Sequence, residues 1–293
     1  MEILETFEHV EAWTRPFADA ERERALRALE GGKILYFPHL AYELGDGERA
    51  FLTPQCTDGK AKNISYDPRE DTVRGTSLEG EARSRLAAMM RRYGDTAQQF
   101  LRALIPAYRD HLERARTSYR PVEIKGRASS SNKDDTRLHV DAFPSRPNHG
   151  RRIMRVFTNV NPRGEPRVWR VGEPFESFAR RFLPTVPRQV PGSARLMHWF
   201  GITKSLRTAY DHTMLNLHDH GKRDDEYQST APQQRLELPA GATWIVYTDQ
   251  VLHAAMAGQY VFEQTFHLDV DSLARPETAP LRQLERLTGR ALA

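Results

Sequence analysis

The sequence predicts an α+β fold in which a mainly helical layer, residues 1–120, supports a β-rich core, residues 121–271, with a last helix at 272–293. Two observations carry this prediction. Apolar residues recur at helical spacing before residue 120, and short β-like runs separated by Pro, Gly and Asn follow it. The chain has 293 residues and no evident repeat or low-complexity stretch, which suits a single domain with a sizeable core.

The N-terminal layer is predicted to hold three helices and a buried strand. The first helix covers 18–29 and ends at a glycine pair, and the short bulky run 33–37 forms the strand. Residues 79–119 carry apolar side chains at helical spacing, and we expect two amphipathic helices that break near Gly94, with Pro106 as a kink.

The β-rich core is predicted from many short strands with turn formers between them. This pattern favours an antiparallel sandwich or barrel. Helices at about 174–182 and 205–218 interrupt it. The predicted strands are 122–128, 136–143, 153–160, 168–171, 235–238, 243–248 and 260–270.

Composition excludes several classes of protein. The longest apolar run is five residues, too short for a transmembrane helix, and the acidic N-terminus does not resemble a secretory signal. The single cysteine rules out an internal disulfide and a cysteine-based zinc finger, so we expect a cytoplasmic protein. Because the net charge is only +4, from 43 basic and 39 acidic residues, an anion must be bound by a local cluster of cations.

A metal site is the sharpest local signal. His139 and Asp141 are two residues apart in a predicted strand, so both side chains point to one face. His253, between two later strands, would complete a 2-His-1-carboxylate set, which is typical of non-haem Fe(II) oxygenases. An H-x-D triplet also arises by chance. The competing His218-x-His220 motif follows a helical run in a polar segment, where we expect a solvated loop.

The ligand pattern resembles that of oxygenases that use O2 and 2-oxoglutarate, whose distal carboxylate needs a cation. Arg155 lies 14 residues after Asp141 with apolar neighbours, and a guanidinium binds a carboxylate through a bidentate fork. The alternative is an internal ion pair, for instance with Glu263. Asn159 and Gln264 are further candidates for contact with the cosubstrate.

Four phrases of the sequence carry a family resemblance: HVDAFPSRP, RIMRVFTNVNP, WRVGEPFESFARRF and HAAMAGQYVFEQTFHLDV. They resemble the bacterial 3-deoxy-D-manno-oct-2-ulosonic acid (Kdo) hydroxylases over most of the chain. The resemblance implies a double-stranded β-helix (jelly-roll, cupin-like) core, Fe(II) and 2-oxoglutarate, and hydroxylation of Kdo at C3 to give the octulosonic acid called Ko. It also implies an acceptor in which Kdo is attached to a lipid A precursor, met at the cytoplasmic face of the inner membrane.

The sequence is compatible with such an anionic glycolipid. Seven arginines and one acidic residue lie between Arg146 and Arg170, although a solvated loop face would explain some of them. The predicted acceptor contacts are Arg127, Lys133, Arg146, Arg151 and Arg152.

Other interpretations remain open from the sequence. A hydroxylase acting on protein or nucleic acid, a cupin-type isomerase or hydrolase, and a non-catalytic glycolipid-binding protein would share the core. No nucleic-acid-binding module is recognisable, so we expect no nucleic acid partner. The sequence allows peripheral contact with the inner membrane and leaves open whether the chain forms a homo-oligomer.

Overall fold

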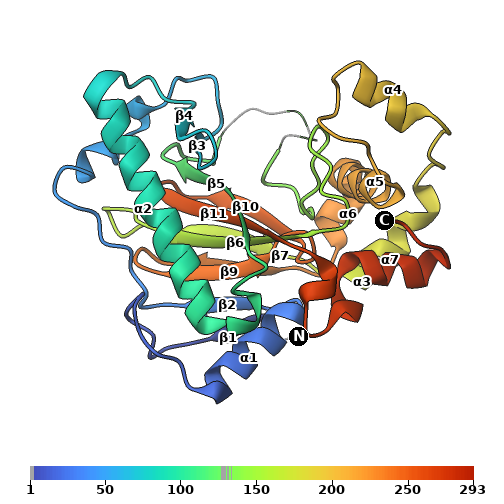
Figure 1. Ribbon diagram of the computed structural model, residues 1–293, viewed down its shortest axis with the longest axis horizontal. Helices are drawn as coiled ribbons and strands as arrows, with labels where there is room; N and C mark the ends of the chain where they lie inside the picture. The colour runs from blue at the N-terminus through green and yellow to red at the C-terminus, as the bar shows by residue number, and fades with distance from the viewer. Residues whose placement is uncertain (1–2, 127–129, 131, 133) are drawn as a thin grey trace.

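The computed structural model describes residues 3–126, 130, 132 and 134–293, which form two β-sheets with helices packed around them (Figure 1). The strands are β1 (Leu4–Thr6), β2 (Ile34–Phe37), β3 (Ile64–Asp67), β4 (Thr72–Arg74), β5 (Glu113–Arg120), β6 (Arg152–Asn159), β7 (Arg167–Val171), β8 (Gln234–Leu238), β9 (Thr243–Tyr247), β10 (His253–Ala257) and β11 (Val261–Leu268). The larger sheet has the order β1-β2-β9-β6-β11-β5-β3-β4, and the smaller has the order β10-β7-β8.

Neighbouring strands run antiparallel apart from the parallel pair β1–β2. The predicted α+β fold with a jelly-roll-like core is therefore confirmed. The strands expected near 33–37, 153–160, 168–171, 235–238, 243–248 and 260–270 are all present within a few residues.

Aromatic side chains fill the space between the two sheets. Phe157 of β6 stacks on Trp244 of β9 at a centroid distance of 5.2 Å, and Trp169 of β7 meets both rings edge-on. All three side chains are buried. This cluster joins the sheets, and Phe157 and Trp169 also line the cavity of the candidate site.

The helices are α1 (Asp19–Glu30), α2 (Gly80–Leu104), α3 (Phe175–Phe182), α4 (Ser193–Trp199), α5 (Ala209–Arg223), α6 (Asp225–Thr230) and α7 (Pro280–Thr288). Figure 1 shows α2 lying across the larger sheet. Tyr93 of α2 stacks on Phe262 of β11 at 4.8 Å, and Phe262 stacks on Tyr119 of β5 at 4.9 Å. Burial of these rings fixes the helix on the outer face of the sheet.

The predicted break near Gly94 is wrong, because α2 is one continuous helix of 25 residues. A Cβ at Gly94 would lie 2.1 Å from Arg114 Nη2 and 2.5 Å from Gln264 Oε1. The glycine thus permits close approach of the sheet, and this packing outweighs a helix penalty of about 1 kcal/mol. Pro106 starts a separate 3₁₀ turn after the helix has ended.

One helix prediction and two strand predictions are also wrong. Residues 113–119, which we expected to be helical, lie in β5, and no strand occupies the described part of 122–128. Because β5 lines a polar cavity, it lacks the apolar alternation that would have revealed it. Residues 136–143 form no regular strand, since His139 pairs with His253 of the small sheet whereas the Asp141 amide donates to Thr248 O beside the large one.

Helices were missed after β7. The predicted loop around His218 and His220 lies on α5, and neither α4 nor α6 was expected. Within the described residues, none of the helices is long and apolar enough to span a bilayer.

Candidate metal centre and its cavities

The structure brings His139, Asp141 and His253 together although 113 residues lie between the two histidines. One ligand atom from each side chain lies within 4.8 Å of the others, and among the described residues no second cluster of this kind is found. Two backbone hydrogen bonds hold the histidines side by side, His139 N to His253 O at 3.1 Å and His253 N to His139 O at 2.9 Å. The two ligand-bearing segments are thus positioned by strand pairing.

Backbone carbonyls orient both imidazole rings. His139 Nδ1 lies 2.7 Å from Arg137 O, and His253 Nδ1 lies 2.8 Å from Val251 O. With the proton on each Nδ1, the Nε2 atoms keep a lone pair for a metal ion. Burial lowers the pKa of both histidines, which favours the neutral, ligating form.

Asp141 is ionised although it is partly buried. Burial alone would raise the pKa of its carboxyl, but Arg155, whose Nη2 lies 2.8 Å from Asp141 Oδ2, holds that pKa well below its usual range. Two neutral imidazoles and one carboxylate are the donor set that suits Fe(II) with open positions for other ligands. The residues therefore fit the predicted metal.

These three side chains lie in the wall of a cavity of about 280 Å³, here called the metal cavity. Its charged lining carries four basic residues against three acidic ones: Lys62, Arg120, Arg155, Arg167, Asp135, Asp141 and Glu263. The Nε–H groups of Arg120, Arg155 and Arg167 are buried without a hydrogen-bond acceptor among the described residues. Several unsatisfied cationic donors in one enclosed cavity are the surroundings that an anionic ligand requires.

Arg155 reaches the metal cavity as predicted, and it also forms the ion pair that was the alternative. Its Nη1 lies 2.8 Å from Glu263 Oε1, and Arg120 pairs with the other oxygen of Glu263. Burial opposes ionisation of Glu263, but these two arginines lower the pKa of its carboxyl. Arg155 is consequently shared between Asp141 and Glu263.

Arg167 was one of the seven arginines of the predicted basic stretch, but it was not among the predicted contacts of the cosubstrate. Its side chain is buried, and Nη1 donates to Gly258 O at 2.7 Å, but no carboxylate of the described residues lies within ion-pair distance. Burial, assisted by Arg120, lowers the pKa of Arg167 to about 9. Alternation in the strand Arg167–Val171 could have indicated it, because Trp169 of the same strand stacks on His253 and faces inward.

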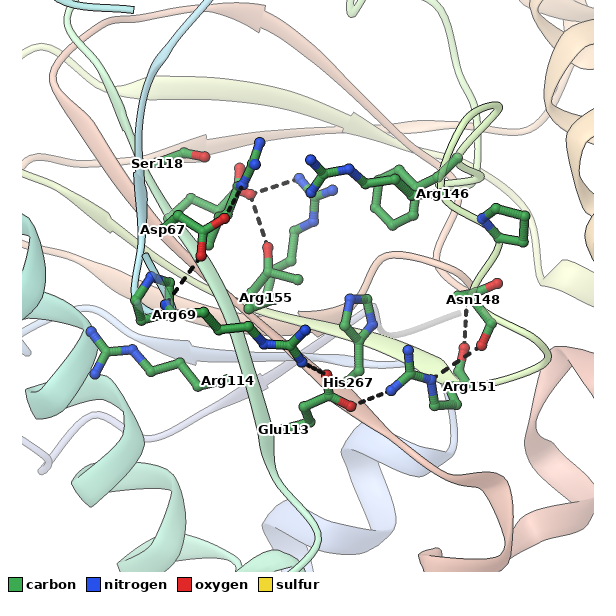
Figure 2. A pocket seen from close by; sticks show the side chains of 17 residues that line it. Asp67, Arg69, Glu113, Arg114, Ser118, Arg146, Asn148, Arg151, Arg155 and His267 are labelled. Atoms are coloured by element: carbon green, nitrogen blue, oxygen red, sulfur yellow. Dashed lines mark hydrogen bonds and ion pairs between the residues drawn. The ribbon is translucent and has the colours of Figure 1, made fainter. Parts of the chain in front are cut away.

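A second, more open cavity of about 380 Å³ adjoins the first and shares Ser118, Arg155 and Glu263 with it. We call it the arginine groove. Its basic side chains are Arg69, Arg114, Arg116, Arg146, Arg151 and Arg155. Figure 2 shows Glu113 between Arg69 and Arg151, with ion pairs to both.

Two of the predicted acceptor residues, Arg146 and Arg151, line this groove, and Arg146 has no ion pair with a described residue. Sequence reasoning missed Arg114 and Arg116 because β5 was assigned to a helix, and Arg69 because it lies in a turn.

Three predicted contacts are corrected by their positions. Arg152 is fully buried and paired with Asp249, so it cannot reach the groove. Asn159 donates to the carbonyls of Glu165 and Leu238 and holds a loop. Gln264 faces α2, because inward and outward side chains alternate in β11 and Glu263 takes the inward position. Arg127 and Lys133 lie outside the described residues.

His218 stands next to the cluster without belonging to it. Its ring packs edge-on against His139 at 5.4 Å, and Nδ1 lies 2.8 Å from Asp219 Oδ1. His220 lies 2.7 Å from the Thr185 hydroxyl instead. Of the competing H-x-H motif, only His218 packs against a predicted ligand, His139, and His220 points elsewhere.

Comparisons with known proteins agree with this geometry. A family model described as 3-deoxy-D-manno-oct-2-ulosonic acid (Kdo) hydroxylase matches residues 12–291. A crystal structure of the Kdo hydroxylase KdoO, a non-heme Fe(II) alphaketoglutarate dependent dioxygenase, in complex with alphaketoglutarate and Fe(III) is 48% identical, with a TM-score of 0.95 over 99% of this chain and 97% of that one. The same enzyme with cobalt(II) gives 49% identity and a TM-score of 0.96 over the same shares of the two chains. A search of curated proteins gave no match.

Proposed function

The chain belongs to the Kdo hydroxylase family, and we propose that it is an Fe(II)/2-oxoglutarate-dependent dioxygenase that hydroxylates C3 of Kdo in a Kdo-lipid A precursor. The observation that carries the proposal is the cluster of His139, Asp141 and His253 in the wall of a cation-rich cavity. A relative of 48% identity that holds iron and alphaketoglutarate supports the same assignment.

In this proposal His139, Asp141 and His253 hold the iron. When bound, Fe(II) with 2-oxoglutarate and O2 supplies the oxidising chemistry, with release of succinate and CO2. The chain's own residues keep the imidazoles in the ligating tautomer, keep Asp141 ionised and keep the site enclosed. The arginines of the cavity orient the two anionic substrates.

Arg155 and Arg167 are the proposed contacts of the cosubstrate, and the contacts favour Arg167 as the anchor of its distal carboxylate. Arg155 already faces two carboxylates, whereas Arg167 is a buried cation with none. A buried guanidinium gains most from a carboxylate partner when it lacks one.

A matched pair of variants tests this choice. Arg167→Lys and Arg155→Lys both keep the charge but lose the fork geometry. We expect 2-oxoglutarate binding to the metal-loaded protein to weaken by about 1–3 kcal/mol in Arg167→Lys, which changes the proposed anchor. A loss only in Arg155→Lys would return the role to Arg155.

The acceptor is proposed to enter by the arginine groove. Arg146 and Arg151 there can donate charge-assisted hydrogen bonds to the Kdo carboxylate or to lipid A phosphates. Binding of groups remote from the reacting carbon helps to orient it, so we expect a truncated acceptor to lose turnover as well as affinity. The corresponding place of action is the cytoplasmic face of the inner membrane.

Acceptor-dependent succinate release tests the function. We expect fast release with Kdo-lipid IVA, slower release with its dephosphorylated form and least with free Kdo. Equal rates with all three would contradict the role of the groove. Turnover with a protein or nucleic acid instead would overturn the acceptor, and no release with any acceptor would indicate a non-catalytic binder.

A further inference from the structure

Residues 188–207, here called the apolar arm, gather all six large hydrophobic side chains that are exposed in the described structure. Their exposed fractions are Val190 68%, Leu196 55%, Trp199 78%, Phe200 64%, Ile202 58% and Leu206 49%. The helix of the arm, α4, buries none of its residues, and it lies at the edge of the molecule away from both sheets (Figure 1). A concentration of exposed apolar side chains in one segment marks an interaction site.

The charge of the arm identifies the partner. Arg188, Arg195, Lys204 and Arg207 lie among the apolar residues, and no Asp or Glu occurs from 177 to 210. Arg188, Arg195 and Lys204 form no ion pair with any described residue. Basic residues combined with exposed Trp, Phe and Leu are typical of elements that lie in the interface of an anionic bilayer.

We propose that the apolar arm docks on the surface of an anionic lipid bilayer, with Trp199, Phe200 and Ile202 entering the headgroup region and the four cations facing lipid phosphates. The idea that docking brings the enzyme to a lipid-linked acceptor rests on the proposed function. The docking of the arm on a bilayer is argued only from the exposure and charge of its side chains.

The base of the arm touches the loop that lines the arginine groove. Lys204 N donates to Ser145 O at 2.9 Å, and Arg207 Nη2 donates to Pro144 O at 2.6 Å. The following residues, 146–148, line the groove. A bilayer bound by the arm therefore lies beside the cavity in which the headgroup of a glycolipid would react.

A second copy of the chain fits this surface less well. A symmetric contact between two arms would bring their cations together, because neither arm supplies an acidic residue. Repulsion between the cations of the two arms would then oppose the burial of their apolar side chains. An anionic bilayer can bury the apolar side chains and also pair with the cations.

Co-sedimentation with vesicles tests the proposal. Wild-type protein should bind phosphatidylethanolamine vesicles that contain phosphatidylglycerol and should bind phosphatidylcholine vesicles weakly. Trp199→Glu should lower binding roughly tenfold or more, and Arg195→Glu about fivefold. Arg27→Glu is the matched control, because Arg27 is an exposed arginine of α1, far from α4 in Figure 1.

Two further measurements separate the possible outcomes. Trp199→Phe should keep vesicle binding but lose the blue shift of tryptophan fluorescence. Trp199→Glu should turn over glycolipid in detergent micelles normally and glycolipid in vesicles slowly. If the wild-type protein binds vesicles but turns over no Kdo acceptor, docking by the apolar arm is supported and the proposed function is overturned. If it turns over a Kdo acceptor but does not bind vesicles, docking by the apolar arm is overturned. A dimer that Trp199→Glu converts to monomer, with vesicle binding unchanged, would also overturn it.

Discussion

Arg152 at the start of β6 and Arg167 at the start of β7 are both buried, yet only Arg152 has a carboxylate partner. Arg152 Nε lies 2.7 Å from Asp249 Oδ2, Nη2 lies 2.7 Å from Gln250 Oε1, and the guanidinium stacks 3.6 Å from the Tyr247 ring centroid. Burial opposes its ionisation, but Asp249 raises the pKa of Arg152, whereas burial lowers that of Arg167 to about 9.

The difference separates a structural cation from a ligand-binding one. Around Arg152 the protein supplies the counter-charge itself, so the region is complete without a ligand. Around Arg167 the counter-charge is missing in a cavity that also contains the metal cluster. An anion that enters this cavity can accept the hydrogen bonds that Arg167 does not make within the described residues.

The largest expected effect tests whether this cavity is a metal site at all. Asp141→Ala and His253→Ala should each abolish turnover while the fold persists, because removal of one protein ligand takes away much of the metal-binding free energy. Iron content and circular dichroism check both parts. His220→Ala is the control and should keep its iron. If instead His220→Ala loses iron and His253→Ala retains it, the ligand set is wrong.

Removal of the paired arginine should mainly reduce stability. Arg152→Met leaves Asp249 buried without a cation, and the free energy of unfolding should fall by about 3–5 kcal/mol. Urea denaturation of the metal-free protein measures this. Replacement of Asp249 by Leu in the same chain should recover part of the loss, and an unchanged stability of the single variant would remove one side of the comparison.

The matched change at Arg167 should mainly reduce binding. Arg167→Met removes a buried cation without a counter-charge, so the metal-free protein should be as stable as wild type or more stable. Its 2-oxoglutarate affinity should fall by about 1–3 kcal/mol. Anaerobic titration of the metal-loaded protein measures the affinity. A destabilised variant with normal affinity would make Arg167 a structural residue like Arg152.

The smallest effect is expected in the arginine groove. Arg146→Gln should weaken the apparent acceptor affinity by about 0.5–1 kcal/mol, because exposed charges are screened. The effect should diminish as salt is added, and 2-oxoglutarate affinity should not change. A loss that persists at high salt would indicate that Arg146 is desolvated in the complex.

Apolar periodicity was sufficient to predict much of the fold. Strands such as 153–160 and 243–248 are apolar because they are buried, and helix 18–29 ends at its glycines as expected. Prediction failed where tertiary contacts overrule local pattern. Gly94 stays helical because the sheet packs against it, and β5 lacks alternation because it lines a polar cavity.

The predicted metal ligands form a cluster because i, i+2 spacing and strand order constrain them strongly. The arginines were harder, since the sequence does not show which of them has a carboxylate partner. Arg152 and Arg167 are both arginines at the start of a strand, and they are distinguished only by the position of Asp249 in the folded structure. Arg155 lines the metal cavity and also forms the ion pair with Glu263 that was the alternative interpretation.

Incubation with ¹⁸O2, 2-oxoglutarate and Kdo-lipid IVA tests the central claim most directly. A dioxygenase of this class splits O2 between cosubstrate and acceptor, so mass spectrometry should find one ¹⁸O in succinate and one in a new hydroxyl at C3 of Kdo. The Asp141→Ala protein should give neither. Succinate formation without label in the sugar, or label at another position of the acceptor, would contradict the assignment.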